Sequence, residues 1–274
     1  MERLLKIAGV NQYLTLLFKK LVYKVLLYKE LLQWYYNNGV VNSFTILDSR
    51  VGKVPGELNT SSLDIKDKSL PVKLEEEKSS DDLKAVRTLE DLKKLIILNC
   101  DCSLKKTAKN IVFSDGNPRA NIMFIGEAPG EIEDKTGKPF KGEAGKLLDK
   151  MLQAIQLNRE NVYLTNIIFW RPPGNRKPTE EEISSCLPFV KKHINLINPK
   201  ILVLVGATAA SAILNIQTGI TQVRGKWKNI ETKDIKSLKS IAIFHPAFLL
   251  RQPSRKREAW EDLKKIKIEI DTHT

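Results

Sequence analysis

Apolar and polar residues follow two alternating patterns from residue 120 onwards. Short apolar runs, typical of buried strands, alternate with stretches whose apolar residues recur at helical spacing. The predicted strands cover 121–126, 162–168, 201–206 and 241–244, and the predicted helices cover 145–155, 179–196, 207–214 and 254–266. Strands that alternate with helices are typical of a parallel sheet covered on both faces. We therefore predict a three-layer α/β/α fold around a central four-stranded parallel sheet.

Two further segments precede this pattern. Residues 1–42 are rich in Leu, Tyr and Val and are predicted to form an N-terminal helical extension. In residues 43–85 Ser, Asp, Lys, Glu, Gly and Pro dominate without an apolar period, which predicts a flexible linker. Residues 86–274 form the predicted α/β domain, which opens with a helix over 89–98 capped by Thr88.

The N-terminal extension and the cysteines indicate where in the cell the protein is expected to be. Lysines interrupt the apolar stretches of residues 1–37, and none approaches the roughly 20 residues that a transmembrane helix needs. We expect the extension to pack on the protein, the alternative being a basic amphipathic helix that touches a membrane or a partner. Three cysteines are too few for a disulfide framework and indicate a reducing compartment. We expect a cytoplasmic monomer without a secretory signal.

The charge balance points to a polyanionic partner. Lys and Arg number 45 against 32 Asp and Glu, a net charge of +13 in 274 residues. This excess favours nucleic acid, with an anionic membrane surface as the second choice. Arg171, Arg176 and the basic run 251–257 follow predicted strands, where they are expected to form a positive rim, the alternative being a solvated basic face.

Polar side chains capable of chemistry follow three of the four predicted strands. Glu127 follows the first strand, Asn166 lies in the second and His245 follows the fourth. Because the carboxyl ends of parallel strands meet at one edge of a sheet, we predict that these three side chains converge. Taken singly, each also has a structural interpretation: a loop carboxylate, a turn residue and a structural histidine.

The loop from Gly126 to Gly130 has a second interpretation, as a cradle for phosphate. Its sequence, Gly-Glu-Ala-Pro-Gly, lacks the Lys and Ser/Thr of a P-loop and does not match the GxGxxG pattern. Its small residues still allow backbone N–H groups to approach a flat ligand or an anion closely.

Three segments, in this order, resemble the family 4 uracil-DNA glycosylases of bacteria and archaea. They are GEAPGEIEDKTGKPFKGEAGKLLDKML, VYLTNIIFWRPPGNRKPTEEE and HPAFLLR. The resemblance extends over residues 95–268. It implies a four-stranded parallel sheet between helices, and it implies hydrolysis of the N-glycosidic bond of deoxyuridine in single- or double-stranded DNA, leaving an abasic site.

The resemblance also implies roles for the residues of these segments. Phe140 would stack on the base that has left the DNA helix, and the side-chain amide of Asn166 would read its edge and reject cytosine. His245 would hydrogen-bond the departing base as negative charge grows on it, and Glu127 would position the attacking water. Backbone contacts near the base are implied for Gly126, Ala128 and Gly130.

Contacts with the DNA are implied at the last of these segments. Leu249, Leu250 and Arg251 would form a wedge that fills the vacated stack and grips phosphate. Arg171 and Arg176 would add positive charge to the rim.

The cysteines depart from the family pattern. Family 4 members usually hold a four-iron cluster with four cysteines: a Cys-x-x-Cys pair, one just ahead of Arg-Pro-Pro and one in the following helix. Here the pair is Cys100-Asp-Cys102 with Asn99 where a cysteine would fit, Trp170 takes the third place, and Cys186 matches the fourth. We predict that the 4Fe-4S cluster is lost and that apolar packing fills its space. The alternative is a three-cysteine cluster with an outside ligand.

Other functions compete with uracil excision. One is a related glycosylase that takes other deaminated bases or becomes covalently trapped on DNA. The trapping relatives carry a basic, histidine-containing loop, whereas residues 134–140 here resemble ordinary family 4 members. Others are a non-catalytic DNA-binding relative and a nucleotide-binding α/β domain, and the absent phosphate motifs disfavour the latter.

Overall fold

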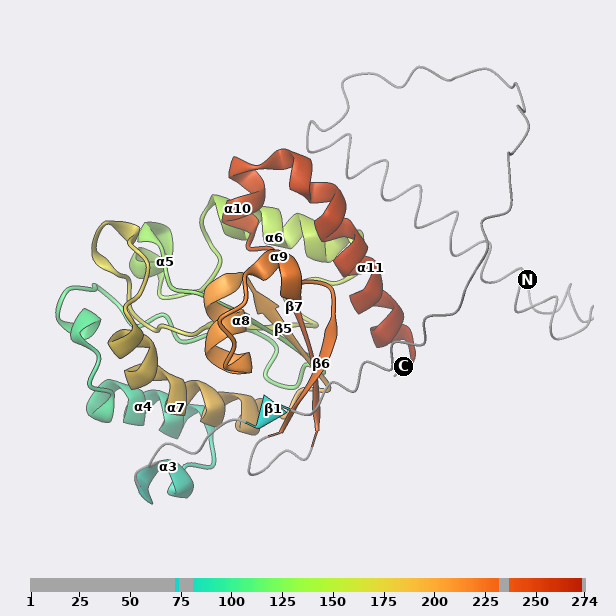
Figure 1. The fold of residues 1–274 in the computed structure, drawn as a ribbon. Coiled ribbons are helices and arrows are strands. Elements are labelled where there is room, and N and C mark those ends of the chain that lie inside the picture. The colour runs from blue at the N-terminus through green and yellow to red at the C-terminus, as the bar shows by residue number, and fades with distance from the viewer. Residues whose placement is uncertain (1–71, 74–80, 232–236, 273–274) are drawn as a thin grey trace, which may run out of the picture. The chain divides into compact units, whose positions relative to one another are not determined.

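A computed structural model describes residues 72–73, 81–231 and 237–272 (Figure 1). The predicted helical extension lies outside the described residues, as does most of the predicted linker. Two short elements of the segment predicted as a linker are described, the strand β1 (Val72–Lys73) and the helix α3 (Asp81–Ala85).

Four parallel strands form the centre of the sheet, as the sequence predicts. In spatial order they are β7 (Leu238–Ile243), β5 (Ile201–Val205), β3 (Ile122–Gly126) and β4 (Tyr163–Asn166). β3 pairs with both β4 and β5, and β5 pairs with β7, in parallel register throughout. Their near-continuous burial agrees with a sheet covered on both faces.

Three strands that the sequence did not predict extend this sheet. β6 (Trp227–Glu231) runs antiparallel to β7 and is itself paired with β1, while β2 (Asp115–Gly116) runs antiparallel to β4. β6 is mostly half-buried and mixed in composition, and β1 and β2 have two residues each, so none leaves a clear apolar run.

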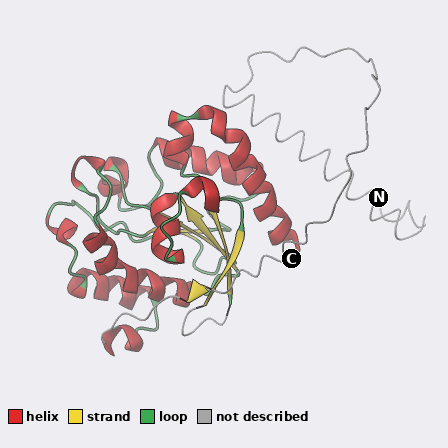
Figure 2. Ribbon diagram, viewed as in Figure 1, coloured by secondary structure: helices red, strands yellow, loops and turns green. Residues whose placement is uncertain are grey.

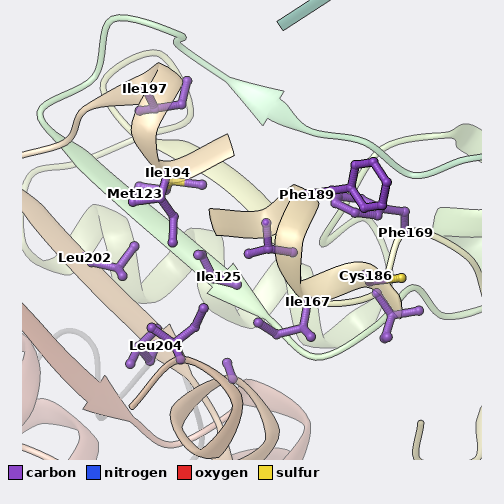
Figure 3. Packing of buried hydrophobic residues seen from close by; sticks show 14 of the residues in the cluster. Met123, Ile125, Ile167, Phe169, Cys186, Phe189, Ile194, Ile197, Leu202 and Leu204 are labelled. Carbon is purple, nitrogen blue, oxygen red and sulfur yellow. The ribbon is translucent and has the colours of Figure 1, made fainter. Parts of the chain in front are cut away.

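One face of the sheet packs against the helices α4 (Leu89–Asn99), α7 (Glu180–Ile197), α8 (Ala207–Leu214) and α9 (Ile220–Val223). Figure 3 shows this layer from close by, with side chains of β3 and β5 beside those of α7. All the labelled residues belong to one buried cluster, which includes Met123, Leu202 and Ile194. Burial of this apolar layer on folding supplies the main stabilisation of the sheet on this side.

The opposite face carries α6 (Glu143–Ala154), α10 (Pro246–Arg251) and α11 (Lys256–Thr272), which lie on the other side of the strands from α4 and α7 (Figures 1 and 2). α10 packs against α6, and α11 packs against β7. The short helix α5 (Glu131–Thr136) follows β3. In the part of the chain that is described, no helix is both long enough and apolar enough to cross a membrane.

Side-chain caps define the starts of two helices as the sequence predicts. The Thr88 side chain accepts a hydrogen bond from the Asp91 N–H at 3.1 Å, and the Asp91 carboxylate accepts from the Thr88 hydroxyl at 2.6 Å. Thr179 and Glu182 form a capping box at the start of α7, with bonds of 3.2 and 2.8 Å. The Thr88 cap satisfies one backbone donor that has no partner inside α4, and the capping box of α7 satisfies two backbone donors.

Candidate active site

The carboxyl ends of the four parallel strands lie at one edge of the sheet. β3 ends at Gly126 and β4 ends at Asn166, and these two residues are paired directly in the sheet register. Gly206 and His245 follow β5 and β7, and a Cβ added to Gly206 would lie 3.0 Å from the Cβ of His245. The strand order reverses between β3 and β5, and open α/β sheets bind their ligands at such a reversal.

Gly126 leaves room for two of the predicted site residues. A Cβ added to Gly126 would lie 2.5 Å from Cζ of Phe140 and 2.5 Å from Oδ1 of Asn166. Any other residue at position 126 would therefore displace the ring and the amide. Both side chains are almost wholly buried, and the half-buried Ala128 packs against the adjacent core.

The ring of Phe140 also faces His245. Their ring centroids lie 6.3 Å apart with an interplanar angle of 29°. Phe140 reaches this place from the loop after α5, and His245 reaches it from the end of β7. The structure thus brings Phe140, Asn166 and His245 to the same end of the sheet.

His245 is held as a neutral imidazole with one nitrogen free to donate. It is the N-cap of α10, and its Nδ1 accepts a hydrogen bond from the Ala247 N–H at 3.1 Å. The proton of the neutral ring is therefore on Nε2. Burial lowers the pKa of His245, and the charge of Arg251 lowers it further, whereas Glu127 and Glu133 oppose the shift.

The Glu127 carboxylate is oriented by Thr208, which the sequence did not single out. The Thr208 hydroxyl, in the first turn of α8, donates to Oε2 of Glu127. Among the described residues, no partner holds the other carboxylate oxygen. Because Glu127 follows β3 and Thr208 follows β5, their bond spans the point where the strand order reverses.

Glu133 is a second carboxylate that the sequence pattern did not reveal as part of this site. Its Oε1 accepts from the N–H groups of Lys141 and Gly142 at 2.7 Å each, and its Oε2 accepts from the Gly130 N–H at 3.0 Å. Glu133 thereby ties the loop after β3 to the loop that carries Phe140. The Gly130 N–H is engaged in this contact, so it is not free for the predicted backbone contact with a base.

The predicted wedge divides into a buried and an exposed part. Leu249 has no exposed surface and packs inside the protein, so its side chain is not presented for the predicted contact with DNA. Leu250 is 45% exposed, and Arg251 is exposed at the end of the same helix. The helical turn of α10, which the sequence analysis did not predict, directs the two leucines to different sides.

The two other predicted DNA-binding arginines have partners within the protein. Arg171 donates to the Asn175 side chain at 2.8 Å and lies 3.8 Å from the Glu131 carboxylate. Arg176 makes two hydrogen bonds of 2.9 and 2.6 Å to Glu182 and remains 44% exposed. Both arginines thus stiffen the loop between β4 and α7.

The three cysteines lie together although Cys186 is distant in sequence from Cys100 and Cys102. Sγ of Cys100 lies 3.8 Å from Sγ of Cys186, and all three thiols are free and buried. A hydrogen bond from Cys186 lowers the pKa of Cys102, while contacts with Cys100 and Cys102, together with burial, raise the pKa of Cys186. Trp170 is also buried and packs edge-on against Phe169, with ring centroids 6.2 Å apart.

This cysteine cluster does not fit a four-iron cluster. Such a cluster takes four thiolates, whereas this chain has three cysteines. Among the described residues, no group of three or more His, Cys, Asp or Glu side chains is arranged to hold a metal ion. An open hollow of about 830 Å³ borders Cys100 and Cys102.

The arrangement at the strand ends suits a planar polar heterocycle. An aromatic ring can stack on such a ligand, and an amide can both donate to its edge and accept from it. A neutral imidazole can donate to an oxygen that gains negative charge, and an oriented carboxylate can take a proton from water.

Comparisons with known proteins agree with this geometry. The family model of the Uracil DNA glycosylase superfamily matches residues 113–264. The chain is 43% identical over 185 residues to the type-4 uracil-DNA glycosylase of Archaeoglobus fulgidus, an alignment that covers 66% of this chain and 92% of the relative. It is 42% identical to the type-4 enzymes of Sulfurisphaera tokodaii and Thermotoga maritima, with 66% and 61% of this chain and 84% and 86% of those proteins covered.

Proposed function

The chain belongs to the uracil-DNA glycosylase superfamily, and we propose that it excises uracil from DNA by hydrolysing the N-glycosidic bond. One observation carries this proposal: Phe140 and Asn166 meet at Gly126, and His245 faces the same ring. Glu127 is held at the same sheet edge by Thr208.

Recognition begins when the target nucleotide leaves the base stack. Phe140 provides the face on which the base stacks, and the amide of Asn166 pairs with its polar edge. Uracil presents an acceptor and a donor there, which one amide can match. Cytosine presents a different donor and acceptor pattern and leaves buried polar groups unpaired, which costs affinity.

Bond cleavage places a negative charge on the departing base. When the bond between C1′ and the base nitrogen breaks, its electron pair remains on the uracil ring. The Nε2–H of His245 donates a hydrogen bond to that anion, and its orientation is already set by the bond from Ala247 to Nδ1. Because burial lowers the pKa of His245, this neutral form prevails at neutral pH.

Glu127 completes the hydrolysis. Its carboxylate orients a water molecule, and its negative charge favours the cationic sugar that forms as the base departs. The water oxygen bonds to C1′ and its proton passes to Glu127, leaving an abasic site and free uracil. Thr208 holds one oxygen of the carboxylate, so the other is directed to the water.

We propose that DNA binds at the rim of this site. We propose that Leu250, exposed on α10, enters the gap that the base leaves, and that Arg251, at the end of the same helix, contacts a phosphate beside it. We propose that Arg171 and Arg176, which lie in the loop after β4 and pair with Glu131 and Glu182, also contact the DNA. We propose that single- and double-stranded DNA both serve as substrates and that the protein acts as a monomer. We also propose a cytoplasmic location, since the three free thiols fit a reducing compartment.

We also propose that excision proceeds without an iron-sulfur cluster. In support, Trp170, which stands where the family pattern has a cysteine, belongs to the same buried apolar cluster as Cys100, Cys102 and Cys186. Iron analysis and the visible absorbance of protein purified without oxygen test this. We expect no iron and no absorbance above the protein band. Stoichiometric iron with a cluster spectrum would instead support a three-cysteine cluster with an outside ligand.

The activity is tested with oligonucleotides that contain uracil, hypoxanthine or xanthine, each as single and double strands. The protein is produced in a host that lacks its own uracil-DNA glycosylase, and abasic sites are cleaved with alkali. We expect turnover with release of free uracil. A protein–DNA adduct that survives denaturation would support covalent trapping, and binding without release would support a non-catalytic relative. Excision of hypoxanthine or xanthine alone would support an altered substrate range.

A further inference from the structure

Phe140 has an unusual backbone conformation for an aromatic residue. Its φ is +55°, in the left-handed region that residues other than glycine and asparagine rarely adopt. A conformation of this kind persists only where the surrounding structure imposes it. Since the ring of Phe140 abuts Gly126 and faces His245, whatever imposes this conformation also sets the stacking surface of the site.

The side chain of Arg159 forms hydrogen bonds with this part of the backbone. It lies between α6 and β4, and its guanidinium donates to the carbonyl oxygens of Pro139, at 3.1 Å, and of Phe140. Two consecutive carbonyls held by one planar group fix the orientation of the peptide between them. Arg159 reaches them from the backbone side, so it acts on the ring only through the main chain.

Two carboxylates hold the guanidinium in turn. Asp149 of α6 accepts from Nε at 2.9 Å and from Nη2 at 3.3 Å, and Asp115 of β2 accepts from Nη1 at 2.6 Å. Together with the two carbonyls, these bonds use the full donor capacity of an arginine. The Arg159 side chain is 19% exposed and that of Asp115 is 16% exposed, so their ion pair is largely shielded from water, whereas Asp149 is 41% exposed.

The start of α6 packs closely against the other side of the Phe140 main chain. A Cβ added to Gly145 would collide with the Phe140 carbonyl group. The main chain at Phe140 is thus enclosed by the backbone of α6 and by the guanidinium of Arg159.

We propose that Arg159 is a positioning residue for base excision, which holds Phe140 in the left-handed conformation that presents its ring to the base. This inference rests on the proposed function of the site. The alternative is that the ion pairs of Arg159 only stabilise the fold. In that case the effect of removing Arg159 would be the same with and without the aromatic ring of Phe140.

A double-mutant cycle separates the two roles. Single-turnover rates of uracil release are measured for the wild-type protein, Arg159→Gln, Phe140→Ala and the double variant, with thermal unfolding recorded for each. We expect Arg159→Gln to be about 10- to 100-fold slower than wild type, since small misplacements at a reacting centre have effects of this size. In the Phe140→Ala background the same change has less than about a twofold effect, because the ring that Arg159 places is gone.

Two further variants serve as controls. Lys141→Gln removes the ion pair of 2.9 Å to Asp115 but no bond to either carbonyl, and it retains the wild-type rate. Arg159→Lys keeps the charge but cannot bond two carbonyls and two carboxylates at once, so it is slow like Arg159→Gln, and it carries the test if Arg159→Gln does not fold.

The outcomes separate this inference from the proposed function. If the wild-type protein releases uracil and Arg159→Gln or Arg159→Lys is equally fast, the inference is wrong. It is also wrong if the Arg159 substitution slows release equally in both backgrounds. If the folded wild-type protein releases no uracil at all, the proposed function is wrong.

Discussion

The bond between Thr208 and Glu127 determines which carboxylate oxygen is free to accept a proton. It joins residues that follow two different strands, β3 and β5, so the helix α8 contributes directly to the geometry of the site. At the scale of single residues, the proposed catalytic carboxylate and the hydroxyl that orients it lie far apart in sequence.

Replacement of Thr208 tests this orientation. Thr208→Val keeps the shape of the side chain but loses the hydroxyl, and we expect uracil release about tenfold slower, the size of one hydrogen bond to a charged group. Ser211→Ala is the matched control, since that hydroxyl is exposed and donates only to the Thr208 carbonyl, at 3.2 Å. Equal single-turnover rates for Thr208→Val and wild type would show that Glu127 needs no such partner.

Substitution of the two leucines of α10 is expected to affect different properties, stability for Leu249 and activity for Leu250. Leu249→Ala removes a side chain with no exposed surface and should lower the free energy of unfolding by about 2–5 kcal/mol. Leu250→Ala, at a position that is 45% exposed, should change it by less than about 0.5 kcal/mol but slow excision from duplex DNA. Urea unfolding measures the stability of each variant, and excision from duplex DNA measures its activity. If Leu249→Ala slowed excision without loss of stability and Leu250→Ala did the opposite, Leu249 would be the residue that contacts DNA.

The site residues that the sequence predicted share one property. Glu127, Asn166 and His245 follow or end buried strands, and the geometry of parallel sheets places such residues together. Thr208 and Glu133 act through tertiary hydrogen bonds, which leave no periodic signal. The buried position of Leu249 could not be predicted because it depends on α10, whose six residues are too short for a clear apolar period.

At the scale of elements, β4 and α7 are joined by a buried polar contact. The Tyr163 hydroxyl lies 2.7 Å from Nε2 of His193, and the ring of Phe113 stacks on His193 at 4.5 Å. Burial lowers the pKa of His193 to about 3. The folded state therefore binds this proton less readily than the unfolded chain, whose histidines titrate near pH 6.5.

The burial of His193 predicts a loss of stability in acid. Stability from neutral His193 is complete above about pH 6.5 and is lost progressively as the pH falls towards 3. Between pH 7.5 and 5, the unfolding free energy of wild type should fall by about 2 kcal/mol more than that of His193→Gln. Tyr163→Phe, which keeps the imidazole, should retain the wild-type pH dependence in urea unfolding. A wild-type pH dependence in His193→Gln would contradict this account.

The elements that the sequence predicted are those with long or uniform apolar patterns. The four parallel strands and the helices α7 and α8 agree with the predicted ranges to within a few residues. β6 was missed because its residues are mixed and mostly half-buried, and pairing with β7 rather than composition makes it a strand. The short helix α5 was missed because it has no buried apolar face. Its only buried side chains are the carboxylates Glu133 and Asp134.

At the scale of the whole molecule, charge predicts how DNA binding depends on salt. With a net charge of +13, affinity for DNA without uracil should fall steeply and linearly on a log–log plot against salt concentration. Arg251→Ala should reduce the magnitude of that slope by about 1 if the side chain contacts one phosphate. Fluorescence anisotropy measures both slopes.

Lys239→Ala provides the matched control for this measurement. Lys239 lies near the start of β7, remote from His245 along the strand, and pairs with Glu269 at 2.6 Å. Its removal should leave the salt slope unchanged. An unchanged slope for Arg251→Ala, or an equal reduction for Lys239→Ala, would mean that DNA does not approach along the rim formed by α10.

The rate of free-uracil release from a uracil-containing oligonucleotide, in a single turnover, tests the central claim most directly. The account predicts release by the wild-type protein and a loss of about 100-fold or more in Glu127→Ala and in His245→Ala, with thermal unfolding close to wild type. Wild-type rates in both folded variants would contradict it, because the chemistry would then lie elsewhere than at these strand ends.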